Sequence, residues 1–288
     1  MAIKGAIIGD IIGSAFEFNN ILAKDNILPQ DIVLYIKDGT ICCGRSDDKT
    51  AILSTKDYEF TDDTVLTLAT KYAILHKLPF AEAYAMFGLM YRNKGYGGMF
   101  LDWLDSDDRK PYGSYGNGSA MRVSYIADHF DDFAMVQDMA KESAECTHNH
   151  HEGIKGAVVT ASCIWFAKHK IADKEGILRY AIASYPKDKY PYSPAITLDE
   201  MREYYTWNAT CQGSVPAAIR CIYEANNYTE FVCNVLSLNC DTDTLCAIGG
   251  GIAEELFDNS ADPILTHADE ILNKYLDDYL LDILKNKN

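Results

Sequence analysis

Two short acidic strings are the residues of this chain best suited to do chemistry. Thr61-Asp62-Asp63-Thr64 and Asp241-Thr242-Asp243-Thr244 lie about 180 residues apart, and each joins two carboxylates to hydroxyl groups. Carboxylate and hydroxyl oxygens are hard ligands of the kind that Mg²⁺ and Mn²⁺ prefer, whereas zinc sites favour nitrogen and sulfur. The two strings together therefore predict a site for one or two such divalent cations.

Each string also suits the first turn of a helix, which gives it a purely structural interpretation. Thr61 precedes an apolar-periodic run that starts at Val65, the pattern of an N-cap followed by acidic residues. Asn239 or Asp241 precedes a similar run that starts at Leu245. Capping explains either string alone, but it is compatible with metal binding because a capped turn holds its side chains at fixed angles. The presence of both strings beside the motifs below favours the metal site.

The apolar N-terminal segment carries a strip without side chains. Gly5, Gly9 and Gly13 recur every four residues along the expected helix. Glycine costs roughly 1 kcal/mol per position in a helix interior relative to alanine, so three of them indicate close approach by another backbone or by a ligand. Asp10 and Glu17 are seven residues apart and lie on nearly the same face. The alternative is tight helix packing with two solvated acids.

A glycine-rich turn, Gly113-Ser114-Tyr115-Gly116-Asn117-Gly118, leads into another expected helix. Such a turn presents backbone N–H groups and the positive end of the helix dipole to an anion. Tyr115 could stack on a base or contact a phosphate. The alternative is a plain turn followed by an N-cap.

Three histidines, His148, His150 and His151, lie between Cys146 and Gly156. They invite a zinc interpretation, but neither a flanking cysteine pair nor an H-E-x-x-H pattern accompanies them, so the sequence does not favour zinc. A polar loop that caps the next helix is the alternative for this segment.

Composition argues against several classes of protein. The chain has 288 residues, of which 48% are hydrophobic and 24% charged, an ordinary globular balance. Its formal net charge is −16, so direct nucleic-acid binding is not expected, because phosphate contacts need a basic surface. Nine cysteines show neither regular spacing nor a C-x-x-C pair. With no signal-peptide pattern and no apolar run of about 18 residues, we expect a reduced, cytoplasmic protein that does not enter a membrane.

Helical periodicity dominates, and strand signals are few. We expect one all-α domain over residues 1–288. A small hairpin is expected from residues 32–36 and 51–53, around Gly39 and Gly44, and a long loop with three prolines over 184–197. The expected helices cover residues 2–16, 64–77, 80–93, 118–128, 131–145, 151–169, 174–183, 198–206, 213–226, 228–237, 243–257 and 265–286.

These segments together resemble the ADP-ribosylglycohydrolase family, which includes the dinitrogenase-reductase-activating glycohydrolases and the J1 crystallins. The likeness follows the family's order along nearly the whole chain, and several motifs in order are far more specific than any one of them. The matching motifs are Gly5-x-x-x-Gly9-Asp10-x-x-Gly13-x-x-x-Glu17, Thr61-Asp62-Asp63-Thr64, Gly116-Asn117-Gly118-Ser119-Ala120-Met121-Arg122, Thr147-His148, Thr210-Cys211-Gln212-Gly213-Ser214-Val215-Pro216 and Asp241-x-Asp243-Thr244.

The resemblance implies a compact, all-α, multi-helix orthogonal bundle with two Mg²⁺ or Mn²⁺ ions at the base of a cleft. It implies a metal-dependent hydrolase that cleaves the bond between the distal ribose of ADP-ribose and an acceptor such as an arginine or serine side chain. The partner would be ADP-ribose, or a protein or small molecule that carries it. The metal ligands implied by the family's pattern are Thr61, Asp62, Asp63, Asp241, Asp243 and Thr244.

The same resemblance assigns individual roles. Glu17, Asp62 and Asp241 are the implied catalytic residues: Asp241 would activate the water, and Glu17 matches a gating acid. Asp10 would support these groups from behind. By the same resemblance the glycine-rich turn would hold the diphosphate, Tyr115 would line the cleft, and His148 would lie near the ligand. The implied substrate-binding residues are therefore Gly113, Ser114, Tyr115, Gly116, Asn117, Gly118 and His148.

The chain departs from the family's pattern at Asn239 and Cys240, where relatives usually have glycines. We hypothesise that Cys240 makes the activity sensitive to oxidants. Residues 19–60 and 184–207 carry no family signature, and we expect them to form lids and to set acceptor specificity. Two other functions stay open at this point: a non-catalytic ADP-ribose-binding or crystallin-like protein on the same fold, and a hydrolase of a small ADP-ribosyl metabolite.

Overall fold

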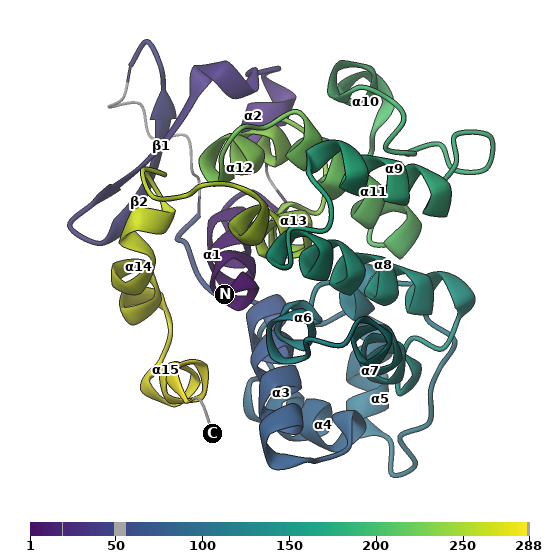
Figure 1. Ribbon diagram of the computed structural model, residues 1–288. Coiled ribbons are helices and arrows are strands. Elements are labelled where there is room, and N and C mark those ends of the chain that lie inside the picture. Colours follow the sequence, from purple (N-terminus) through teal and green to yellow (C-terminus); the bar gives the residue numbers. More distant parts are fainter. Residues whose placement is uncertain (19, 49–55, 287–288) are drawn as a thin grey trace.

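Helices form almost all the regular structure of this protein (Figure 1). A computed structural model describes residues 1–18, 20–48 and 56–286. Within these residues one two-stranded sheet accompanies the helices, which confirms the expected all-α class. The α-helices are α1 (Ala2–Ser14), α2 (Ile21–Lys24), α3 (Asp62–His76), α4 (Phe80–Met90), α5 (Gly98–Asp105), α6 (Ser124–His129), α7 (Phe133–Glu145), α8 (His151–Lys168), α9 (Lys174–Ser184), α10 (Leu198–Tyr204), α11 (Cys211–Tyr223), α12 (Tyr228–Leu236), α13 (Thr242–Leu256), α14 (Ala268–Tyr275) and α15 (Asp278–Lys285).

Helices α1 and α13 lie against each other at the centre of the molecule (Figure 1). A Cβ atom built on Gly9 would lie 2.3 Å from the carbonyl oxygen of Cys246, and one built on Gly250 would lie 2.4 Å from the carbonyl oxygen of Gly5. Both helices thus use glycine so that their backbones touch, which confirms the predicted close approach along the N-terminal strip. The alternative of tight helix packing with two solvated acids holds for the packing, but it fails for Asp10, whose side chain is fully buried.

The other helices are arranged around this central pair. Helices α8, α11 and α12 pack against α13, and helices α3 and α6 pack against α1. Helix α3 begins after Thr61, whose hydroxyl accepts a hydrogen bond from the N–H of Asp63, and α11 begins after Thr210, which caps the N–H of Gly213. These caps satisfy donors that the first turn of a helix leaves free. Residues at or beside the starts of α3, α11 and α13 line one cavity of the molecule.

The hairpin is shorter in sequence than expected. Strand β1 (Ile32–Lys37) matches the first expected strand, but its antiparallel partner is β2 (Thr40–Arg45), with Ile32 opposite Arg45. The expected second strand at 51–53 lies outside the described residues. The turn is Asp38-Gly39, and both residues have positive φ (50° and 69°), as in the two-residue turns that suit a twisted hairpin. An Asp-Gly pair between two apolar runs is a recognised hairpin signal, and it lies at this turn.

Several expected helices differ in extent from the observed ones. The segment 265–286 contains a 3₁₀ turn and then α14 and α15, because Asp277 caps the N–H of Leu280 and starts a new helix. The segment 118–128 begins instead with the 3₁₀ turn Asn117–Ser119, and α6 starts at Ser124. Helices α2 and α5 were not expected. The loop over 184–197 is confirmed, since α9 ends at Ser184 and α10 begins at Leu198.

The contact between α1 and α13 predicts that Gly9→Ala is strongly destabilising. The added methyl group would press on backbone atoms of α13 that cannot move aside, so the free energy of unfolding should fall by roughly 3 kcal/mol. Urea unfolding followed by circular dichroism measures this change. Gly98→Ala is the matched control, because a Cβ there would meet no atom within 4 Å, and it should cost nothing. Equal stabilities of the two variants would contradict this account of the helix contact.

Candidate active site

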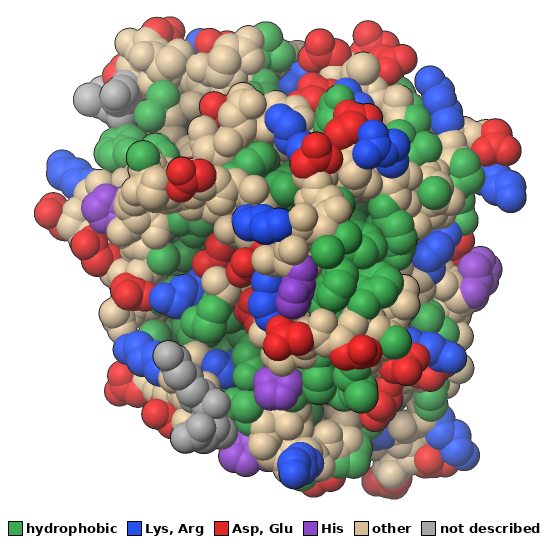
Figure 2. Space-filling model, in the orientation of Figure 1, with side chains coloured by type: hydrophobic (Ala, Val, Ile, Leu, Met, Phe, Trp, Pro, Cys, Tyr) green, Lys and Arg blue, Asp and Glu red, His purple; other side chains and the backbone are tan. Residues whose placement is uncertain are grey.

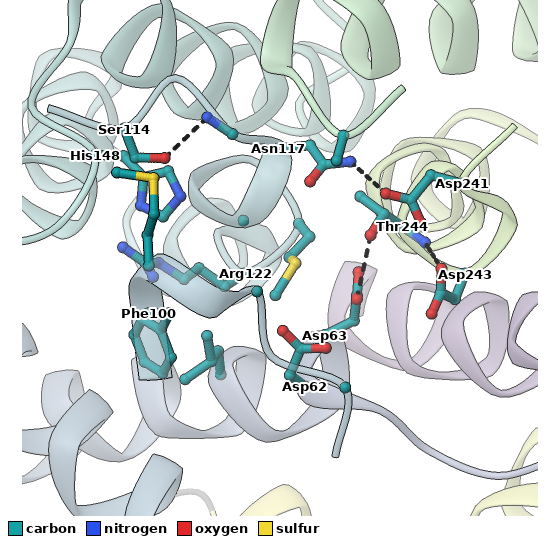
Figure 3. Close-up of a pocket in the computed structure, with 18 of the residues that line it drawn as sticks. Asp62, Asp63, Phe100, Ser114, Asn117, Arg122, His148, Asp241, Asp243 and Thr244 are labelled. Carbon is teal, nitrogen blue, oxygen red and sulfur yellow. Dashed lines mark hydrogen bonds between the residues drawn. The ribbon is translucent and has the colours of Figure 1, made fainter. Parts of the chain in front are cut away.

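A cavity of about 440 Å³, here called the central cavity, opens where the starts of α3 and α13 meet (Figure 3). Carboxylates from both acidic strings line it, together with Glu17 and part of the glycine-rich turn. Residues nearly 180 positions apart in sequence therefore share one cavity. The predicted site residues that line the central cavity are Glu17, Asp62, Asp63, Ser114, Gly116, Asn117, Gly118, His148, Asp241, Asp243 and Thr244.

Asp10 holds the first acidic string in place from beneath. Its carboxylate accepts hydrogen bonds from the backbone N–H groups of Thr61 and Thr64, each at 3.0 Å, and from both threonine hydroxyls. Thr61 in turn caps α3, as expected from the sequence. Four hydrogen bonds therefore fix the position from which Asp62 and Asp63 enter the cavity. Such a geometry suits the supporting role predicted for Asp10.

Hydrogen bonds link the second acidic string to the first string and to the glycine-rich turn. The side-chain amide of Asn117 donates to Asp241 at 2.8 Å, and the hydroxyl of Thr244 donates to Asp63 at 3.3 Å (Figure 3). Asp243 accepts from the N–H of Thr244 at 2.8 Å. The remaining residue of the string, Thr242, donates to a backbone carbonyl of α1. Its hydroxyl is thus engaged in helix packing.

Two groups of carboxylates lie close enough to share a cation each. The first comprises Asp10, Asp63 and Asp243, and the second comprises Glu17, Asp241 and Asp243; within each group the oxygens lie within 4.8 Å of one another. Asp243 belongs to both groups. The Oδ1 atom of Asp63 is buried and has no hydrogen-bond partner, so it is an acceptor that a cation would satisfy. Oxygen donors in this arrangement fit Mg²⁺ or Mn²⁺.

Burial and mutual repulsion disturb the protonation of this cluster. Burial, followed by the charge of Asp243, raises the pKa values of Asp62 and Asp63 well above the usual value for aspartate. Burial likewise raises the pKa of Asp241 to about 6, and burial with the nearby Asp243 charge raises the pKa of Glu17 to about 8. Carboxylates this close cannot all ionise cheaply unless a positive charge joins them.

The opposite side of the central cavity carries a buried positive charge (Figure 3). The guanidinium of Arg122 is fully buried, donates to Thr147 and to the carbonyl of Ser143, and lies 4.0 Å from the ring centre of Tyr84. Its Nε and Nη1 atoms have no partner, and no ion pair to it occurs among the described residues. A buried cation without a counter-charge is costly, which favours an anion at this end of the cavity.

His148 lies beside Arg122 and stays neutral. Burial, and then the charge of Arg122, lower its pKa well below the usual value for histidine. Its Nδ1 atom contacts the hydroxyl of Thr147 at 2.8 Å. A Cβ atom on Gly118 would lie 3.2 Å from its Nε2 atom, and one on Gly116 would lie 3.4 Å from it. The two glycines therefore leave room around the second ring nitrogen.

The glycine-rich turn is anchored to the start of α11. The N–H of Asn117 donates to the carbonyl of Ala209, and the N–H of Cys211 donates to the carbonyl of Tyr115, both at 2.9 Å. Gly113 and Tyr115 are not among the cavity-lining residues. The side chain of Tyr115 is 48% exposed, and its ring lies against His150. Its contact with a ligand stays a prediction.

Other lining residues had no assigned role in the sequence analysis. One wall is formed by Gly95, Gly97, Gly98, Met99 and Phe100, and the three glycines at and just before the start of α5 were a signal that could have found it. Arg122 stood inside a quoted motif without a function. Two aromatic residues, Phe18 and Trp207, also line the cavity. Trp207 falls in the segment 184–207 that we expected to influence acceptor choice.

Cys240 does not have the properties of a redox-sensitive thiol. Its side chain is 1% exposed, and burial raises its pKa well above the usual value for cysteine. The reactive form of cysteine is the accessible thiolate, so a buried, protonated thiol reacts slowly with peroxide. The hypothesis that Cys240 makes the site sensitive to oxidants is therefore not supported. Its neighbour Asn239 is exposed and is not a lining residue.

Comparison with known proteins identifies the family. The family model for ADP-ribosylglycohydrolase matches residues 1–253. This chain belongs to the ADP-ribosylglycohydrolase family. It is accordingly a hydrolase, as the sequence predicted.

Relatives are distant but extend over most of the chain. The ADP-ribosylhydrolase ARH3 of Mus musculus is 25% identical over 87% of this chain and 81% of its own length. The putative ADP-ribosyl glycohydrolase L543 of Acanthamoeba polyphaga mimivirus is 23% identical over 94% of this chain and 90% of its own length. A solved ADP-ribosylglycohydrolase-related protein complex shares the fold, with a TM-score of 0.58 and 17% identity over 95% of this chain and 98% of that one.

Two expectations concern nucleic-acid binding and entry into a membrane. Acidic and basic side chains are interspersed over the face shown in Figure 2, without a broad basic patch on that face. The expectation that the protein does not bind nucleic acid rests on the net charge of −16 and stays a prediction. Among the described residues, no helix combines the length and the apolar character needed to cross a membrane.

The carboxylate cluster predicts that a divalent cation stabilises the protein more strongly as pH rises. In the folded protein Asp241 and Glu17 bind protons up to about pH 6 and pH 8, whereas unfolded carboxylates release them near pH 4. The metal-free protein should therefore lose stability as pH rises from about 4 to 8. Mg²⁺ replaces those protons, so at saturation it should raise Tm by roughly 5 °C at pH 8 and by less at pH 5.

Thermal unfolding at pH 5, 6, 7 and 8, in EDTA and in Mg²⁺, tests this expectation. Asp243→Asn removes the carboxylate that both groups share and should abolish most of the Mg²⁺ effect. Asp107→Asn, at an exposed position outside the cavity, is the matched control and should keep it. A shift in Tm of equal size at pH 5 and pH 8 would argue against cation binding by this cluster.

Proposed function

We propose that this enzyme hydrolyses the glycosidic bond between the distal ribose of ADP-ribose and an acceptor side chain, with the help of two divalent cations. The observation that carries the proposal is the charge separation in the central cavity, with shared carboxylates at one end and an unpaired guanidinium at the other. ADP-ribose has matching ends, since its diphosphate is anionic and its distal ribose offers a diol that bound cations can hold. The relatives named ADP-ribosylhydrolase ARH3 support this choice of substrate.

The cations would be held by Asp62, Asp63, Asp241 and Asp243 with the hydroxyls of Thr61 and Thr244, while Asp10 supports this set from behind. When bound, such cations orient the ribose diol and lower the pKa of a bound water. The unpartnered oxygen of Asp63 and the bridging position of Asp243 between the two groups support two ions rather than one. Mg²⁺ and Mn²⁺ are both compatible with this oxygen-rich set.

Asp241 is the residue we propose to take the proton from the attacking water. Its carboxylate is oriented by the amide of Asn117 and lines the acidic end of the central cavity, where it can accept a proton from water. The water oxygen bonds to the anomeric carbon, the bond to the acceptor atom breaks, and the acceptor leaves with the electron pair and gains a proton. Positive charge develops on the ribose as this bond breaks, and the carboxylates of Glu17 and Asp62 stabilise it.

The other end of the cavity is suited to the diphosphate. Arg122 supplies a positive charge that no carboxylate of the described residues pairs with, and Gly116 and Gly118 present backbone groups without side chains in the way. Neutral His148 can donate a hydrogen bond from the ring nitrogen that faces these glycines. This arrangement would fix the common part of every ADP-ribosylated substrate.

Release of free ADP-ribose tests the proposal directly. We expect release from an arginine-linked or a serine-linked ADP-ribosyl peptide in Mg²⁺ or Mn²⁺, and none in EDTA, because the carboxylates cannot hold the ribose without cations. Liquid chromatography of the products measures it. A folded protein that binds ADP-ribose by calorimetry but releases none would be a binding protein. Turnover of a free ADP-ribosyl metabolite alone would indicate the small-molecule hydrolase.

Asp62→Asn and Asp243→Asn should each lower kcat by about two orders of magnitude or more, because each removes a charge from the cation site while keeping its shape. The fold should survive, since neither residue lies in the apolar core, and circular dichroism provides the check. Asp107→Asn should keep the activity of the parent. Full activity of Asp243→Asn would rule out the assignment of the cations to this cluster.

A further inference from the structure

Two aromatic side chains stand exposed at the acidic end of the central cavity. Phe18 is 68% exposed and Trp207 is 45% exposed, and their ring centres lie 6.3 Å apart at an angle of 32°. They come from separate segments, one directly after Glu17 and the other four residues before the start of α11. Both line the cavity. Scattered exposed apolar residues need no explanation, but a contacting pair at the edge of an active-site cavity does.

The position of this aromatic pair relative to the reacting bond follows from the sequence, because Phe18 is the neighbour of Glu17. The carboxylate of Glu17 lies within 4.8 Å of those of Asp241 and Asp243, so Phe18 starts beside the residues that face the distal ribose. ADP-ribose extends from there toward Arg122 at the other end. The group attached to the anomeric carbon must therefore leave the cavity on the side of the acidic cluster, where the pair lies.

The chemistry of the pair favours a planar, positively charged acceptor. The amino group of Lys56 lies 4.9 Å from the ring centre of Phe18, which shows that this ring face accommodates a cation. The carboxylates that line the cavity gather at this end, whereas its lining arginine, Arg122, lies at the other. This distribution of charge favours a cationic acceptor over a neutral one.

We propose that Phe18 and Trp207 form the acceptor subsite, and that they favour an arginine guanidinium over a serine hydroxyl. The guanidinium is planar and remains charged when it is linked to ribose, so it can stack on aromatic rings. A serine linkage offers neither a flat surface nor a charge. The inference rests on the proposed glycohydrolase function, and it assigns specificity to two residues that carry no part of the bond cleavage.

The test compares one peptide ADP-ribosylated on arginine with the same peptide ADP-ribosylated on serine. For Phe18→Ala and Trp207→Ala, the ratio of kcat/KM on the arginine peptide to that on the serine peptide should fall roughly threefold to thirtyfold. Calorimetry should show the affinity for free ADP-ribose changed by less than about twofold, because the rings contact the acceptor alone. Phe18→Tyr and Trp207→Phe keep the rings and should restore most of the ratio.

Tyr204→Ala is the matched control. Tyr204 is 42% exposed, its ring lies 5.9 Å from that of Tyr192, and it does not line the cavity, so its removal should leave the ratio unchanged. An unchanged ratio in both alanine variants would overturn the acceptor subsite, as would a loss that is equal for both peptides and accompanied by weaker ADP-ribose binding. A parent enzyme that cleaves only the serine peptide overturns this inference alone. A parent that releases ADP-ribose from neither peptide overturns the proposed function as well.

Discussion

The contact between the backbones of α1 and α13 is the constraint on which the rest of the structure depends. Gly13 sits so close to α13 that a Cβ atom on it would lie 2.4 Å from the Cα atom of Asp243. This contact fixes where the second acidic string begins. On the same helix, Asp10 reaches the start of α3 and holds Thr61 and Thr64 by four hydrogen bonds. One buried helix thereby positions both acidic strings, and the glycine strip and the carboxylate cluster are two parts of the same arrangement.

The cluster places strong demands on its surroundings. Several carboxylates are buried together, and no lysine or arginine pairs with the acids of the two strings among the described residues. Isolated buried charges are too costly to persist, so such a cluster either keeps its protons or binds cations. The buried guanidinium of Arg122 presents the opposite problem at the other end of the cavity. A ligand with an anionic middle and a metal-binding diol relieves both costs, which links the energetics of the site to its choice of ligand.

The sequence was sufficient for the fold class and for most helices, because periodicity and capping are local signals. The meeting of the two acidic strings followed instead from their shared oxygen-ligand chemistry. It was insufficient where a competing local signal decided the outcome. Asp277 could continue a helix or cap a new one, and only packing of the C-terminal segment settles that choice. The Asp38-Gly39 pair is a hairpin signal that could have placed the second strand directly after it, at Thr40–Arg45. The importance of Arg122 could not be derived from sequence, since it depends on the absence of an acidic neighbour in space.

ADP-ribose binding and acceptor recognition are assigned to different parts of the chain, the first mainly to helix starts and an anchored turn, the second to connecting segments. The acidic strings lie at the starts of α3 and α13, and the glycine-rich turn is anchored to the start of α11, so hydrogen bonds fix most of the groups proposed to hold ADP-ribose. Phe18 and Trp207 lie outside regular helices, in connecting segments that tolerate substitution more readily. The part of the substrate that is common to all ADP-ribosylated molecules thus meets the rigid core. The acceptor, which differs between substrates, meets residues that can change without disturbing the carboxylate cluster. Acceptor preference can therefore vary within such a fold while the bond-cleaving machinery stays constant.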